Sequence, residues 1–274
     1  MKFLIDPLNI LLPILYIGVV YAYGKSFFKL SKPAETLKTP LLFILIIVHF
    51  IYLILRTVAF AHSPITTIFE IFSTVSFSVT LAYAYIQVKT KVRSTGFFIL
   101  IVGFFFQLFS SLFIKDLLNV PEVLRSNLLG FHVVSALLGF SAITISAIYG
   151  MLYLMLYHDI KSNRFGIVYQ RLPNLEILER MSLTATIFGF VLLTVAIVVG
   201  LVWLPKAFET FSYADPKLIG TVFIWVLYAT GLIANKIARW QGKRIVWLSI
   251  LGFIVSFFSM TIVNMFFSGF HKFY

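Results

Sequence analysis

Long apolar runs follow one another along almost the whole chain, and short polar connections separate them. Each run holds about 20 residues, the length that an α-helix needs to cross the roughly 30 Å hydrocarbon core of a bilayer. The pattern predicts an all-α, polytopic membrane protein in which residues 1–274 form one integral membrane domain. We expect eight transmembrane helices, at residues 8–24, 40–61, 66–88, 96–114, 129–157, 181–203, 218–236 and 245–269.

The composition supports this interpretation. The chain is 60% hydrophobic and 12% charged, about half the charged fraction of an average soluble domain. It contains no cysteine, which excludes disulfide exchange and cysteine-ligated metal sites. We also find no metalloprotease, P-loop or dinucleotide-binding motif, so hydrolytic and nucleotide chemistry have no positive support.

The basic residues predict the orientation of the helices. Fifteen of the 22 lie in the connections that follow the odd-numbered runs: Lys25, Lys29, Lys32, Lys38, Lys89, Lys91, Arg93, Lys161, Arg164, Arg171, Arg180, Lys236, Arg239, Lys243 and Arg244. Because basic connections stay in the cytoplasm, we expect both termini on the outer side of the cytoplasmic (inner) membrane. This bias explains most of the net charge of +12. We therefore expect membrane lipid as a partner and do not expect nucleic acid.

Several polar residues then fall near the outer face. His132 lies about one turn inside the fifth run, His271 follows the last one, and the loop "FETFSYADPKLIGTVFIW" joins the sixth and seventh. Neutral imidazole is a common axial ligand of haem iron, and two histidines at matching depth could hold the iron from opposite sides. The alternative is that each is an interfacial histidine bonded to water or to the backbone.

Three ionisable residues lie within or near the second and third runs. His49 is in mid-span, where such groups are costly; it is either functional or a neutral histidine bonded to a neighbouring helix. Arg56 and Glu70 are equally far from residue 63 in the connection, so an antiparallel hairpin places them at similar depth. We predict an Arg56–Glu70 ion pair, which is either structural or holds Arg56 towards an anionic group such as a propionate.

The order of these features resembles the cytochrome c assembly family of membrane haem-handling proteins, which includes CcsA, CcmC and HemX-like proteins. The resemblance covers roughly residues 40 to 274. It rests on "HFIYLILRTVAFAHSPITTIFE", on "FHVVSALLGFSAITISAIYGMLYLMLYHDIK", on the loop quoted above and on the closing "VNMFFSGFHKFY". These stretches carry His49, Arg56, Pro64, Glu70, His132, Asn264, Gly269, His271 and Tyr274.

The resemblance implies that the outer loop is a haem platform and that His132 and His271 are axial ligands of haem b. It further implies two partners, a membrane protein of the ResB/CcsB type and an apocytochrome c that receives the haem. The chain would then not be an enzyme by itself but part of a haem–cytochrome c ligation complex. The remaining cofactor-binding candidates are His49, Arg56 and the residues in or beside the loop, namely Trp203, Phe208, Phe211, Tyr213, Asp215 and Trp225.

The loop departs from the family pattern. Aligned on Asp215, the three tryptophan positions of the platform hold Phe208, Ser212 and Ala214, and Asn235 replaces a histidine near the cytoplasmic end of the seventh run. Two alternatives to haem delivery therefore stay open. One is a HemX-like accessory or regulatory protein linked to tetrapyrrole synthesis, and the other is a structural subunit that has lost haem.

Overall fold

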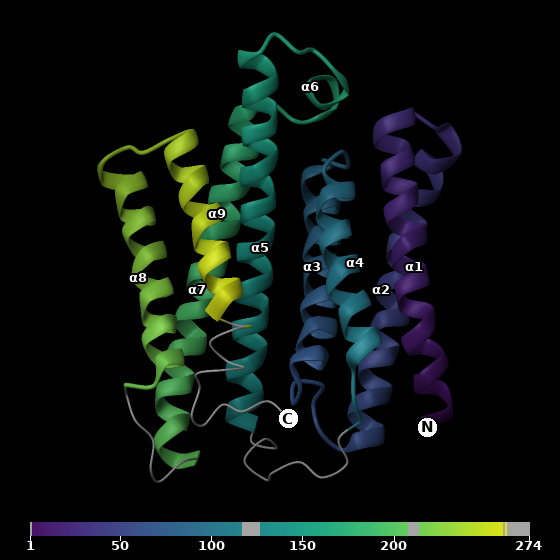
Figure 1. Ribbon diagram of the computed structural model, residues 1–274, viewed down its shortest axis with the longest axis vertical. Coiled ribbons are helices and arrows are strands. Elements are labelled where there is room, and N and C mark those ends of the chain that lie inside the picture. The colour runs from purple at the N-terminus through teal and green to yellow at the C-terminus, as the bar shows by residue number, and fades with distance from the viewer. Residues whose placement is uncertain (1, 117–126, 208–213, 260, 262–274) are drawn as a thin grey trace. The chain divides into compact units, whose positions relative to one another are not determined.

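The structure, a computed structural model, describes residues 2–116, 127–207, 214–259 and 261, and these ranges consist of helices and the connections between them (Figure 1). The helices in these ranges are α1 (Lys2–Lys29), α2 (Lys32–Phe60), α3 (Ile68–Thr90), α4 (Gly96–Phe113), α5 (Asn127–Lys161), α6 (Ile167–Arg171), α7 (Leu175–Ala207), α8 (Pro216–Ile237) and α9 (Lys243–Phe258).

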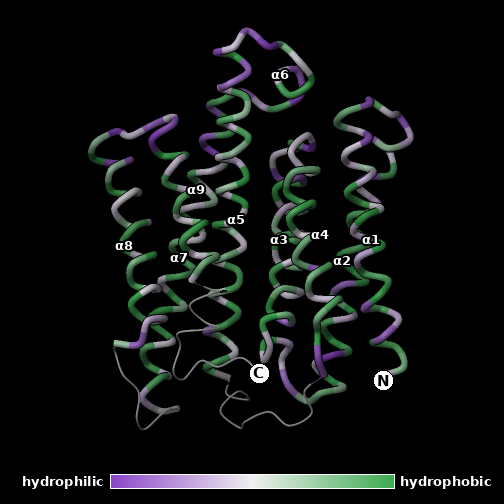
Figure 2. Tube along the Cα trace, in the orientation of Figure 1, coloured by the Kyte–Doolittle hydropathy of each residue, from purple (hydrophilic) through white to green (hydrophobic). Residues whose placement is uncertain are grey.

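Seven helices in the described part of the chain are long and apolar enough to cross a membrane: α1 to α5, α7 and α8. They correspond to the first seven predicted runs, and Figure 2 shows hydrophobic positions along them with hydrophilic positions gathered at the connections. Helix α9 begins the eighth predicted run, 245–269, whose last part lies outside the described residues. The chain is therefore a multi-pass helical membrane protein.

Most helices extend beyond the predicted apolar runs. Helix α5 has 35 residues, a length of about 50 Å at 1.5 Å per residue, and ends in a polar turn at Lys161. Hydropathy marks only the segment in contact with hydrocarbon, whereas the helix continues until its backbone hydrogen bonds end. For the same reason the pattern did not predict the short helix α6 in the polar connection after α5.

The chain divides into two compact units, and the first comprises residues 1–120 and 165–173. Within it, α1 packs against α2 and α4, and α3 also packs against α2 and α4. Small residues permit the close approach of α3 and α4: the hydroxyl of Ser76 donates to the carbonyl of Gly103 at 2.6 Å. Such contacts replace the hydrophobic driving force, which is absent between helices in lipid.

The second unit comprises residues 121–164 and 174–274. Helix α5 packs against α7 and α9, while α8 packs against α7 and α9. A cluster of buried hydroxyl groups joins three of these helices: Ser146 of α5 lies 2.7 Å from Thr186 of α7, which lies 3.1 Å from Ser249 of α9. Because hydrocarbon offers no water, these hydroxyl groups bond to one another and fix the three helices in register.

The substitution Gly96→Ala tests the close packing of the first unit. A Cβ atom at Gly96 would overlap the buried ring of Tyr23 and the hydroxyl group of Tyr83, so we expect a loss of roughly 1–3 kcal/mol in unfolding free energy. Gly18→Ala is the matched control, because nothing lies within 4 Å of its added Cβ atom. Thermal unfolding in detergent would measure both variants, and equal melting temperatures would contradict the packing described here.

Candidate functional site

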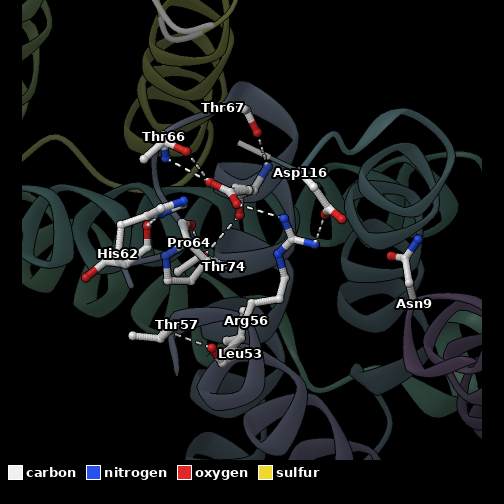
Figure 3. A network of polar contacts seen from close by, with 12 residues as sticks. Asn9, Leu53, Arg56, Thr57, His62, Pro64, Thr66, Thr67, Thr74 and Asp116 are labelled. Carbon is white, nitrogen blue, oxygen red and sulfur yellow. Dashed lines mark hydrogen bonds and ion pairs between the residues drawn. The ribbon is translucent and has the colours of Figure 1, made fainter. Parts of the chain in front are cut away.

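An ion pair is buried where α2 ends and α3 begins. Nη2 of Arg56, in the last turns of α2, lies 2.9 Å from Oε1 of Glu70, in the first turn of α3 (Figure 3). The side chains are 2% and 0% exposed. The structure thus contains the pair that the hairpin spacing predicts, and its depth requires that each charge have a partner.

Glu70 is held on its other side by the α2–α3 connection. Its Oε2 accepts the backbone N–H of Thr66 at 2.9 Å and the hydroxyl of Thr66 at 2.7 Å. The hydroxyl of Thr67 accepts the N–H of Glu70 at 3.1 Å and caps α3. Thr67 and Glu70 form the Thr-x-x-Glu pattern of a helix start, a signal that would have found this cap from the sequence.

Asp116 also contacts Arg56 and is the third charged residue of this cluster, which the sequence interpretation did not include. Its Oδ1 lies 3.3 Å from Nη1 of Arg56, and its side chain is 35% exposed. Two carboxylates thus share one guanidinium, with Glu70 on Nη2 and Asp116 on Nη1. An additional anion would have to compete with them, which favours a structural role of Arg56 over the binding of a propionate.

His49 lies at the centre of the first unit and is fully buried. Its Nδ1 lies 3.1 Å from the hydroxyl of Tyr16 on α1, and its Nε2 lies 3.0 Å from the hydroxyl of Ser73 on α3. Each ring nitrogen of His49 therefore has a hydroxyl partner, and the hydroxyl of Ser73 also donates to Gln107 of α4 at 2.9 Å. A metal at either nitrogen would have to replace a hydroxyl partner, so this arrangement favours the alternative of a hydrogen-bonded helix contact.

His132 lies in the second unit, near the start of α5, and is partly buried. Its Nδ1 donates a hydrogen bond of 2.7 Å to the carbonyl of Ala196 on α7. One turn further along α7 is Gly200, whose added Cβ would lie only 2.8 Å from Nδ1. A neutral ring that donates from Nδ1 carries its lone pair on Nε2, and metal-binding histidines commonly use this donor–carbonyl pairing.

The other described candidates of this unit flank the connection between α7 and α8. Trp203 is buried three residues after Gly200, and Asp215 is buried directly before α8, where its carbonyl accepts the N–H of Ile219 at 3.1 Å. The indole N–H of Trp225 donates to the hydroxyl of Thr194 on α7 at 2.9 Å. Trp225 therefore joins α7 to α8, and its N–H donor already has a partner.

The structure separates the predicted site residues into two sets. The first unit contains His49, Arg56 and Glu70. The second unit contains the other described candidates, namely His132, Trp203, Asp215 and Trp225. The predicted ligand His271 and the ring residues Phe208, Phe211 and Tyr213 lie outside the described residues. Within the described ranges there is no group of three or more histidine, aspartate or glutamate side chains that could hold a metal ion.

Comparison with known proteins yields a consistent match. The family model described as "Cytochrome C assembly protein" matches residues 35–271. The cytochrome c biogenesis protein CcsA of Guillardia theta is 27% identical over 237 residues, which cover 80% of this chain and 79% of that protein. CcsA of Porphyra purpurea is 26% identical over 257 residues, again 80% of this chain and 81% of that protein. Protein HemX of Bacillus subtilis (strain 168) is 29% identical over 120 residues, 44% of each chain.

Glu70→Gln tests the buried ion pair. The substitution leaves the charge of Arg56 buried beside a neutral amide, so we expect a loss of roughly 3–5 kcal/mol in unfolding free energy. Asp116→Asn is the matched control, and because Asp116 is partly exposed its loss should stay below about 1 kcal/mol. Denaturant unfolding in detergent would compare them. Losses of similar size would mean that Glu70 is not the principal partner of Arg56.

Gly200→Ala tests how His132 is held. The added methyl group would push the imidazole ring off the carbonyl of Ala196, so the Nδ1-protonated tautomer should lose its preference. Nitrogen NMR of protein labelled on histidine would measure the tautomer directly. Gly130→Ala on α5 is the control, since nothing lies within 4 Å of its added Cβ atom. An unchanged His132 signal in Gly200→Ala would contradict the assigned contact.

Proposed function

Because the chain belongs to the cytochrome c assembly protein family, we propose that it is a haem-handling membrane protein of cytochrome c biogenesis. Its cargo would be haem b, presented at the outer face of the cell membrane for attachment to an apocytochrome c. The chain would act as a carrier and not as an enzyme by itself, with a membrane partner of the ResB/CcsB type completing the ligation complex.

The geometry of His132 is the observation that carries this proposal. A ligand histidine must keep its ring in one orientation and one tautomer, and the Nδ1–H bond to Ala196 supplies both conditions. The lone pair on Nε2 is then the atom that would bind haem iron. Gly200 contributes by leaving room for the ring against α7.

The other predicted residues have complementary roles in the proposal. His271 would bind the iron from the opposite side, and the ring faces of Phe208, Phe211 and Tyr213 would contact the macrocycle. These smaller rings lack the N–H donors of indoles, so the cargo would be held less tightly than by a platform of tryptophans. Asp215 would fix the end of the loop at the start of α8.

The first unit would support the carrier instead of touching the cargo. Arg56 and Glu70 would fix the α2–α3 hairpin, because the guanidinium of Arg56 already has two carboxylate partners. His49 would act as the hydrogen-bonded centre of the unit. A propionate could reach Arg56 only after Asp116 moved away.

A second candidate function has support from two observations. The chain is similar to Bacillus subtilis HemX over 120 residues, and phenylalanine, serine and alanine stand at the tryptophan positions of the platform. A HemX-like accessory or regulatory protein would influence tetrapyrrole synthesis without delivering haem to a cytochrome. Deletion of the gene discriminates between the two, because loss of covalent cytochrome c supports delivery and a changed tetrapyrrole content supports the HemX-like role.

An absorption spectrum of the purified protein, with haem supplied during expression, tests the proposal. We expect a haem Soret band that is lost in His132→Ala and in His271→Ala, since each removes one axial ligand. His158→Ala is the matched control; this exposed histidine lies near the opposite end of α5 from His132, and its removal should leave the band unchanged.

Two outcomes would contradict the proposal. A colourless wild-type protein that remains well folded would point to a structural subunit without haem. A Soret band that survives both substitutions would mean that haem is bound through other residues.

A further inference from the structure

The turn that joins α8 to α9 has an unusual concentration of positive charge. Four side chains between residues 236 and 244 are basic and exposed, namely Lys236, Arg239, Lys243 and Arg244. No aspartate or glutamate occurs in this stretch. We propose that this basic turn, residues 236–244, is a preformed binding site for the headgroup of an anionic phospholipid.

Hydrogen bonds fix the shape of the basic turn. The side-chain amide of Asn235 donates to the carbonyl of Trp240 at 2.7 Å, and the N–H of Trp240 donates to the carbonyl of Ala234 at 3.2 Å. Gly242 has φ 62° and ψ −133°, a conformation that is easily reached only by glycine. Asn235, at the position where the family pattern has a histidine, thus closes the turn.

Two contacts attach the basic turn to the neighbouring helices. The N–H of Gly242 donates to Oε1 of Glu179 on α7 at 2.7 Å. The ammonium group of Lys243 lies 3.7 Å from the centre of the ring of Tyr157 on α5, a cation–π contact. The backbone of the turn and one of its cations are therefore held before any ligand arrives, which lowers the entropy cost of binding.

The surroundings of the turn favour a lipid over an acidic protein. Only residues 238–242 separate the two helices, so the cations cannot extend far from the ends of the spans. Large side chains in the turn and in the first turn or so of α9 are exposed: Ile237 by 78%, Trp240 by 36% and Trp247 by 51%. Tryptophan is typical of the depth of lipid headgroups, and Figure 2 shows the hydrophilic turn directly beside hydrophobic helix ends.

The charge of the site matches one class of lipid. The carboxylate of Glu179 touches the turn, so four cations and one anion leave a net positive charge. Each basic residue near a membrane surface strengthens the binding of anionic lipid by about fivefold. A zwitterionic headgroup such as phosphatidylcholine would gain little from such a site, whereas phosphatidylglycerol would gain from each cation. The inference does not depend on the proposed haem function.

The experiment compares lipid binding by the full chain in detergent. Native mass spectrometry would measure the affinity for added phosphatidylglycerol and for phosphatidylcholine. In R239Q/R244Q we expect the affinity for phosphatidylglycerol to fall by at least tenfold, with phosphatidylcholine unaffected. The matched control is K25Q/K29Q, which removes two exposed charges from the end of α1. It should change the affinity by less than about twofold.

A third variant separates shape from charge. Asn235→Ala keeps all four cations but removes the bond to Trp240, so a weakened preference for phosphatidylglycerol would support a preformed site. Equal losses in R239Q/R244Q and K25Q/K29Q would overturn the proposal in favour of general attraction to a basic face. Full lipid binding by R239Q/R244Q would also overturn it and would leave an acidic protein as the occupant to test.

Discussion

The structure depends on one constraint: a polar group inside a bilayer has no water to bond to and must find its partner within the chain. In the first unit the constraint explains why Arg56 and Glu70 pair and why both nitrogens of His49 bind hydroxyl groups. In the second unit it explains the hydroxyl cluster that joins α5, α7 and α9. Polar residues that look functional in an apolar sequence can therefore be the residues that join the helices.

His132 differs from His49 in how its nitrogens are used. His49 is fully buried between two hydroxyl groups, whereas His132 is partly buried and donates from Nδ1 to a backbone carbonyl. A backbone carbonyl can only accept, so it fixes Nδ1 as the protonated nitrogen of a neutral ring. This fixed orientation and the partial exposure of the ring are the physical reasons for proposing His132, and not the fully buried His49, as the haem ligand.

The sequence predicts much of this fold because hydropathy and helix length are local properties. It also predicted the Arg56–Glu70 pair, since a tight hairpin sets the depth of residues on both sides of it. It could not predict the partners of His49 or the contact between His132 and Ala196, because these depend on which helices become neighbours. Asp116 was missed for a related reason. It follows the end of a span, where hydropathy does not indicate towards which helix the chain turns or which side chain Asp116 contacts.

We propose that haem binds through Nε2 of His132 while Nδ1 stays bonded to the backbone of α7. A cryo-electron microscopy structure of the haem-loaded protein would show which histidine holds the iron. We expect iron bonded to Nε2 of His132, with the Nδ1 contact to Ala196 retained and the hydrogen bonds of His49 unchanged. Iron bonded to His49, with Tyr16 or Ser73 displaced and no haem at His132, would show that this proposal is wrong.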